Sequence, residues 1–170
     1  INDVTISNNT TFYIGGGIAI SFCSNPVLTN VTITNNFAAR SGGGIYALFV
    51  EQQFIINNVI VAGNTAIEGA GMVLVASDNI TMDNVTIANN ESEEEEYGAL
   101  SLEGINLSMK NSIIWNNSQE SITLSEGMGG YSNSTAITYS DIEGGWEGEG
   151  NIELAPLFYN PSNDDYTLQS

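Results

Sequence analysis

The heptad NVTITNN at residues 30–36 occurs in five versions along this chain of 170 residues. All five carry Ile or Val at the fourth position and end in Asn: DVTISNN (3–9), NVTITNN (30–36), NVIVAGN (58–64), NVTIANN (84–90) and NSIIWNN (111–117). Successive copies begin 27, 28, 26 and 27 residues apart. A nearly constant period of this size is typical of solenoids, in which each repeat is one supersecondary unit. The heptad therefore predicts a stack of equivalent coils.

Each repeat contains short strands and no helical stretch. In Val31-Thr32-Ile33 the two apolar side chains share one face, which is the period of a β-strand. Glycine clusters follow at 15–17, 42–44, 69–71 and 98–99, and second apolar runs follow at 18–20, 45–50, 72–76 and 100–102. Such strands can pair only with their equivalents one coil away, about 4.8 Å along the axis. The sequence predicts an all-β, right-handed parallel β-helix of five to six coils with about 27 residues each.

The repeat also predicts which side chains stack on one another. The β-branched residues of the heptads should form one interior column: Ile6, Ile33, Val61, Ile87 and Ile114. The final residues of the heptads should form a second column at a corner: Asn9, Asn36, Asn64, Asn90 and Asn117. Stacked side-chain amides can hydrogen-bond along the axis. The glycines allow positive φ and close backbone approach at the next corner.

The chain divides into two parts of one domain. Residues 1–124 carry the coils, and residues 125–170 hold a degenerate coil and an irregular segment that we expect to cover one mouth of the rod. Repeat proteins need such caps because a terminal coil exposes apolar interior and unpaired edges. The first coil begins at once, without a cap. We therefore expect a processed or partial chain, or stacking against another molecule.

Composition excludes several classes of function. The chain has 20 acidic residues, two basic ones and no His, for a net charge of −18. Nucleic acid is a poor partner, because phosphate binding requires Lys and Arg. No apolar run is long enough to insert into a membrane. Cys23 is the only cysteine, and we expect it in the core, so an intrachain disulfide is excluded. Without His, a zinc site is disfavoured, and a catalytic Cys/His or Ser/His pair is excluded.

Clustered acids make calcium the one cofactor to consider. Ca²⁺ takes six to eight oxygen ligands. Acids crowd an insertion after the fourth heptad, a Gly-rich stretch from Asp141 to Glu153, and the run Asn163-Asp164-Asp165. The bland alternative is that they are hydrated surface charges that confer solubility. The weak calcium candidates are Glu91, Glu93, Glu94, Glu95, Glu96, Asp164 and Asp165.

Catalytic groups are sparse. A polysaccharide lyase needs a base, and Arg40 and Lys110 occupy different positions in the repeat, so we expect each to be a surface charge. A glycoside hydrolase needs two carboxylates about 5–9 Å apart. Asp83 and Asp141 are the best strand-associated acids, and no carboxylate recurs at an interior strand position. We therefore name no catalytic residue.

Glycans could also be attached or bound. Nine N-x-[ST] sequons occur, and the repeat itself generates most of them; Asn90 and Asn133 are the ones that we expect in exposed turns. The aromatic residues Tyr97, Tyr131 and Trp146 are candidate sugar platforms, with core or surface packing as the alternative.

The repeats resemble a known group of proteins. GGGI at 15–18 and 42–45, with Ile33-x-x-Asn36 and its copies, is similar to the GGAI and FxxN repeats of polymorphic outer-membrane adhesins. The stretch from NSIIWNN (111–117) through YSDIEGG (139–145) to the end resembles large secreted bacterial β-helix proteins. Pectate-lyase-like solenoids belong to the same broad group. The resemblance implies a secreted or cell-surface location and leaves the activity open.

The function that we expect is non-catalytic: an extracellular structural stalk, an adhesin segment or a self-assembling filament subunit. Its partners would be copies of itself end to end, the remainder of a longer chain, or glycans. The alternative is a polysaccharide-binding or polysaccharide-cleaving, lyase-like module.

Overall fold

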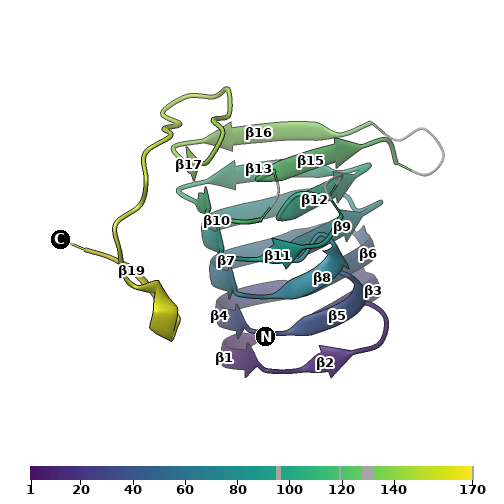
Figure 1. Ribbon diagram of the computed structural model, residues 1–170. Helices are drawn as coiled ribbons and strands as arrows, with labels where there is room; N and C mark the ends of the chain where they lie inside the picture. The colour runs from purple at the N-terminus through teal and green to yellow at the C-terminus, as the bar shows by residue number, and fades with distance from the viewer. Residues whose placement is uncertain (95–96, 119, 128–131, 170) are drawn as a thin grey trace.

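The chain winds into coils that stack along one axis (Figure 1). The computed structural model describes residues 1–94, 97–118, 120–127 and 132–169. Three parallel sheets, A, B and C, form the stack, and the first four coils pass through them in the order A, B, C; among the described strands sheet B ends at β11, sheet C at β15 and sheet A at β16 and β17. The predicted all-β solenoid is confirmed.

Sheet A contains the heptads. Its strand order is β1-β4-β7-β10-β13-β16, with β14 and β17 continuing from β10. β4, β7 and β10 each join the segment before a heptad to the first five residues of that heptad, and the strand bends at Asn30, Asn58 and Asn84, whose φ values are 54°, 54° and 56°. The strands are β1 (Asn2–Ser7), β4 (Val27–Thr34), β7 (Phe54–Ala62), β10 (Ile80–Ala88), β13 (Asn106–Lys110), β14 (Ile113–Trp115), β16 (Ser134–Thr138) and β17 (Asp141–Ile142).

Sheets B and C are joined by the glycine clusters. Gly42 has a φ of 67°, as the corner requires, whereas Gly44 does not have positive φ. A Cβ on Gly44 would lie 2.5 Å from Cγ1 of Val61 and 2.6 Å from the carbonyl oxygen of Gly71, so close approach selects this glycine. Sheet B contains β2 (Thr10–Thr11), β5 (Phe37–Ser41), β8 (Thr65–Glu68) and β11 (Glu91–Ser92); sheet C contains β3 (Ile18–Ser24), β6 (Ile45–Glu51), β9 (Met72–Val75), β12 (Leu100–Glu103) and β15 (Ile122–Ser125).

The interior is apolar and formed mainly by sheets A and C. The pairings Ile6–Ile33, Ile33–Val61, Val61–Ile87 and Ile87–Ile114 place the β-branched residues in one column, which Ile142 continues. Leu74 and Leu102 face them from sheet C and are fully buried. Cys23 is only partly buried, contrary to our expectation, because it lies in the first coil, where β3 pairs with β6 alone among the described strands.

The C-terminal tail covers one end of the rod only in part. Residues 146–152 lie against the last coil, where Trp146 packs on the core and Ile152 bridges to Asp141. The chain then runs down the side of the rod (Figure 1). There β18 (Phe158–Asn160), η1 (Pro161–Asn163) and β19 (Asp165–Leu168) form a hairpin. We call residues 153–169 the C-terminal strap.

Candidate functional site: amide ladders, acidic turns and the C-terminal strap

The column of heptad-final asparagines is a hydrogen-bonded stack, which we call the inner ladder: Asn9, Asn36, Asn64, Asn90 and Asn117. The backbone N–H and the side-chain Nδ2 of Asn36 both donate to Oδ1 of Asn64, at 2.9 and 3.0 Å. Nδ2 of Asn64 donates in turn to Oδ1 of Asn90 and to the carbonyl oxygen of Ile33, each at 3.0 Å.

Asn36, Asn64 and Asn90 are almost fully buried and use all four hydrogen-bonding positions of their amides. Every buried side-chain nitrogen and oxygen in the described ranges has a hydrogen-bond partner. A buried donor or acceptor without a partner lowers stability. The inner ladder avoids this loss, because its buried amides are hydrogen-bonded to one another and to the backbone.

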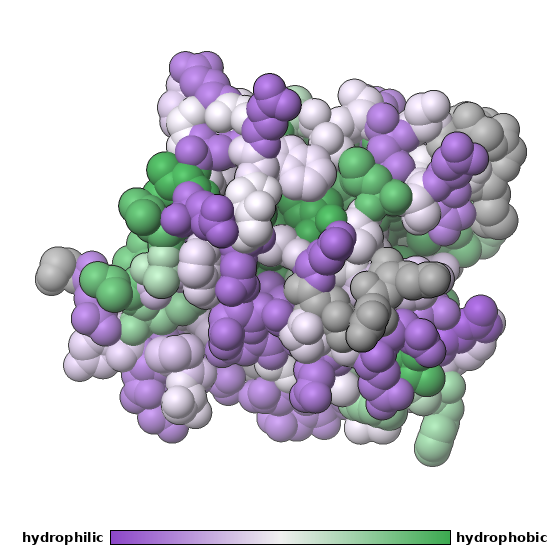
Figure 2. All heavy atoms as spheres, turned by 45° about the horizontal axis from the view of Figure 1, so that its top comes forward, coloured by the Kyte–Doolittle hydropathy of each residue, from purple (hydrophilic) through white to green (hydrophobic). Residues whose placement is uncertain are grey.

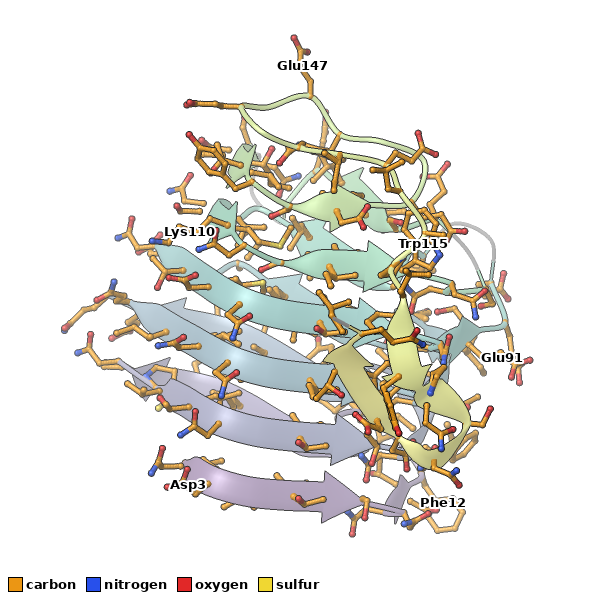
Figure 3. The ribbon with its side chains drawn as sticks, turned by 90° about the vertical axis from the view of Figure 1, so that its left-hand side faces the viewer. Asp3, Phe12, Glu91, Lys110, Trp115 and Glu147 are labelled. Carbon is orange, nitrogen blue, oxygen red and sulfur yellow. The ribbon has the colours of Figure 1, made fainter. Side chains whose placement is uncertain are left out.

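A second amide column lies on the outer surface where the sheet A strands bend. We call it the outer ladder: Asp3, Asn30, Asn58, Asn84 and Asn111. All five have φ between 52° and 56°. Nδ2 of Asn58 donates to Oδ1 of Asn30 at 2.6 Å, and Nδ2 of Asn84 donates to Oδ1 of Asn58 at 2.9 Å. Figure 3 shows Asp3 at the end of this edge, with Lys110 on the same side of sheet A.

The acidic insertion projects into solvent. Glu91, Glu93 and Glu94 are exposed, and Figure 3 shows Glu91 pointing away from the sheets. Glu95 and Glu96 lie outside the described residues. Within those residues, no three acidic or thiol side chains gather where they could hold a metal ion. Calcium binding here stays a prediction.

The other two calcium candidates belong to the strap and bind groups of the protein. Oδ2 of Asp164 accepts a hydrogen bond from Nδ2 of Asn35 at 2.9 Å. Oδ1 of Asp165 accepts from the backbone N–H and the hydroxyl of Thr167, and these bonds lower the pKa of Asp165. Asp165 thus stabilises the hairpin itself, and Asp164 holds the hairpin against the rod.

Acids in the Gly-rich stretch also act as internal acceptors. Asp141 accepts from the backbone N–H of Leu154, and Glu153 accepts from that of Gly144. Glu143 accepts from the backbone N–H of Asn116 at 2.6 Å. These bonds hold residues 141–154 on the last coil. Glu147, in contrast, projects away from the end of the rod (Figure 3).

The two basic residues lie in different sheets. Lys110 in β13 is 3.2 Å from Asp83 of β10 and lines a hollow of about 420 Å³ on the outer face of sheet A. A hydrogen bond from Asn111, together with Lys110, lowers the pKa of Asp83. Arg40 in β5 donates to the hydroxyl of Tyr13 at 3.1 Å, and its guanidinium lies 5.4 Å from the centre of that ring. The structure therefore does not bring the two cations together.

The glycan candidates are placed differently from our expectation. Asn90 is 2% exposed and belongs to the inner ladder, so its expected exposure is wrong. Asn133 is partly buried, accepting from the N–H of Ile105 and donating to the carbonyl of Ser125. Trp146 packs against the core. Tyr97 is partly buried, and Tyr131 lies outside the described residues.

The sequence did not predict the contact between the strap and sheet A. Tyr166 is 5% exposed and packs on Ala62 and Ala88, small residues that pair with each other on sheet A. Its hydroxyl accepts from Nδ2 of Asn89 at 3.0 Å, and burial raises its pKa. The alanines in NVIVAGN and NVTIANN were the available signal, since the other heptads have Ser, Thr or Trp at that position.

Comparison with known proteins agrees with this architecture. The model of the family described as right handed beta helix region matches residues 2–144. Searches of curated proteins and of solved structures returned no match. No helix in the described ranges is long and apolar enough to cross a membrane. Because the match spans most of the chain and ends where the coils end, this chain belongs to the right-handed β-helix family.

Proposed function

We propose that this chain is a non-catalytic scaffold: a secreted or cell-surface β-helix that serves as a stalk or adhesin segment. The observation that carries the proposal is the inner ladder. Asn is the most conspicuous repeated polar residue, and at this corner its amides are committed to one another and to backbone carbonyls. The repeat thus supports length and rigidity.

The remaining charged groups support the same proposal. Lys110 is paired with Asp83, and Arg40 contacts Tyr13 on another sheet. Asp141, which we considered as part of a carboxylate pair, accepts a hydrogen bond from Leu154. On the face in Figure 2, hydrophilic side chains surround smaller apolar patches, as suits a hydrated rod.

Of the two scaffold versions, we favour a stalk over a head-to-tail filament. The edge of β1 pairs with β4 alone among the described strands, and Ile1 and Val4 are exposed there. At the opposite end, residues 146–152 lie on the last coil (Figure 1). Head-to-tail stacking of copies would require these residues to leave.

The proposal is tested by assaying the purified chain on alginate, pectin and chondroitin. We expect no absorbance from unsaturated products, and we expect sedimentation to give a single monomeric species at every concentration. Release of unsaturated product would replace the scaffold with a lyase. Concentration-dependent filaments in electron micrographs would restore the filament version.

A further inference from the structure

Two phenylalanines occupy strained and exposed positions at the corner that follows sheet C. Phe22 in β3 has a φ of 49° and is 76% exposed; Phe49 in β6 has a φ of 50° and is 36% exposed. Bulky side chains rarely adopt left-handed backbone, and here the corner imposes it, because Ala76 and Gly104 at the equivalent positions of the next coils also have positive φ. Among the described residues, Tyr139 is the other aromatic residue with positive φ, and its hydroxyl donates to Glu149 in the cap.

The two rings form one aromatic surface. Their centroids are 5.2 Å apart and their planes are tilted by 35°. The residues that precede them, Ser21 and Leu48, are paired between β3 and β6, so the rings occupy equivalent positions on neighbouring coils.

A hollow opens where this column of residues becomes smaller. The same register leads to Ala76 and Gly104, whose φ values are 45° and 64°. Their short side chains leave a space of about 210 Å³ beside Phe49, lined by Phe49, Ala76, Asp78 and Gly104. This volume admits one small head group and not an oligosaccharide.

The hollow is negatively charged. Asp78 is exposed and lines it, and its backbone N–H donates to the carbonyl of Val50, the residue before Glu51. An aromatic face attracts cations through its quadrupole, and a carboxylate beside it adds direct charge attraction. The net charge of −18 raises the local concentration of cations further.

We propose that this corner binds an organic cation, a quaternary ammonium or guanidinium head group. The ring of Phe49 is the platform, Phe22 extends it, and the Asp78 carboxylate is the counter-ion. The site is independent of the scaffold proposal, and it lies on a different face from the hollow that contains Lys110.

The test is a titration of the ¹⁵N-labelled chain with tetramethylammonium chloride and, separately, with N-acetyl-arginine amide, each against sodium chloride at equal ionic strength. We expect saturable shifts of the Ala76, Asp78 and Gly104 amides with a dissociation constant of about 1–10 mM, the affinity of a single contact site. Preference for the quaternary ammonium would indicate a small amine, and preference for the guanidinium would indicate an arginine of a partner polypeptide; both support the site.

Variants separate this site from general attraction to an acidic protein. Asp78→Asn leaves the aromatic pair intact and should weaken binding about fivefold or more, as should Phe49→Ala. Ala76 occupies the equivalent position in the next coil, so alanine is compatible with the fold at position 49. Phe12→Ala, at a 94% exposed ring on another corner, is the matched control and should bind normally. Shifts that sodium chloride reproduces, or that Asp78→Asn and Phe12→Ala affect equally, would overturn the proposal.

Discussion

The inner ladder and the outer ladder, apart from Asp3, are built from Asn for different physical reasons. The inner amides are buried, and those of Asn36, Asn64 and Asn90 have every donor and acceptor occupied. The outer amides are exposed, and what their residues share is left-handed backbone near a φ of 54°. Asn tolerates this conformation better than other non-glycine residues. Burial therefore decides whether the side chain or the backbone of a repeated Asn stabilises the coil.

The largest expected effect is at the centre of the inner ladder. Asn64→Ala removes the acceptor shared by the backbone N–H and the side-chain Nδ2 of Asn36 and leaves these two buried N–H groups without that partner. Each such group costs about 1–3 kcal/mol, so we expect the free energy of unfolding to fall by about 3–5 kcal/mol. Thermal denaturation should show a midpoint lower by roughly 10 °C.

The matched control is Thr86→Ala, which changes a side chain on the outer face of the same sheet. It should shift the midpoint by less than about 2 °C, as surface substitutions do. Equal melting temperatures for Asn64→Ala and Thr86→Ala would show that the inner ladder adds no stability.

In the outer ladder, the replacement residue should matter more than the lost amide. Asn58→Ala puts a Cβ-bearing residue of low left-handed tolerance at a φ of 54° and should cost about 1–2 kcal/mol. Asn58→Gly should be within about 0.5 kcal/mol of the parent, because glycine adopts this conformation freely. Urea denaturation of the pair measures the difference. Equal losses would mean that the exposed amide bonds, and not the backbone, are what the outer ladder contributes.

Asn89 precedes Asn90 of the inner ladder and donates a hydrogen bond to Tyr166 of the strap, so it links the ladder region to the strap. Tyr166→Phe removes the hydroxyl that accepts from Asn89 and keeps the ring on Ala62 and Ala88. We expect a loss of about 1 kcal/mol and faster amide exchange in β19. Unchanged exchange in β19, measured beside an unchanged control in β7, would show that ring packing alone holds the strap.

The smallest expected effect concerns Asp83, which accepts a hydrogen bond from Asn111, the C-terminal member of the outer ladder. The pKa of Asp83 is lowered in the folded state, so its contribution to stability is present above the unfolded-state pKa and is lost as pH falls through the folded-state value. The side chains are exposed, so the contribution should be below about 0.5 kcal/mol. Between pH 7 and pH 3, Asp83→Asn should lose slightly less stability than the parent. A larger loss in the variant would reverse the sign.

The coils were predictable and the tail was not, for one physical reason. Within residues 3–117 the predictions of strands and side-chain columns rest on the repeat, which places Asn64 on Asn90 and Ile33 on Val61 without knowledge of the rest of the chain. The strap has no period. Its position depends on small side chains at Ala62 and Ala88, which lie 104 and 78 residues before Tyr166, and tertiary packing of this kind leaves no local pattern.

The site predictions differ in the same way. The stacking of Asn9 to Asn117 follows from spacing, whereas a cluster of acids such as Glu91–Glu94 indicates composition and not geometry. Phe22 and Phe49 are spaced by 27 residues and could have been noticed, but their positive φ, which makes them informative, is visible only in three dimensions.

The inner ladder also gives the rod an electrical direction. Each Oδ1 from Asn36 to Asn117 accepts from the coil on its N-terminal side. The amide dipoles therefore add head to tail along the axis, as peptide dipoles do in an α-helix. A coil of opposite polarity would set carbonyl against carbonyl. A coil that extends the inner ladder must therefore share its polarity, so the ladder fixes the chain direction of every coil in the stack.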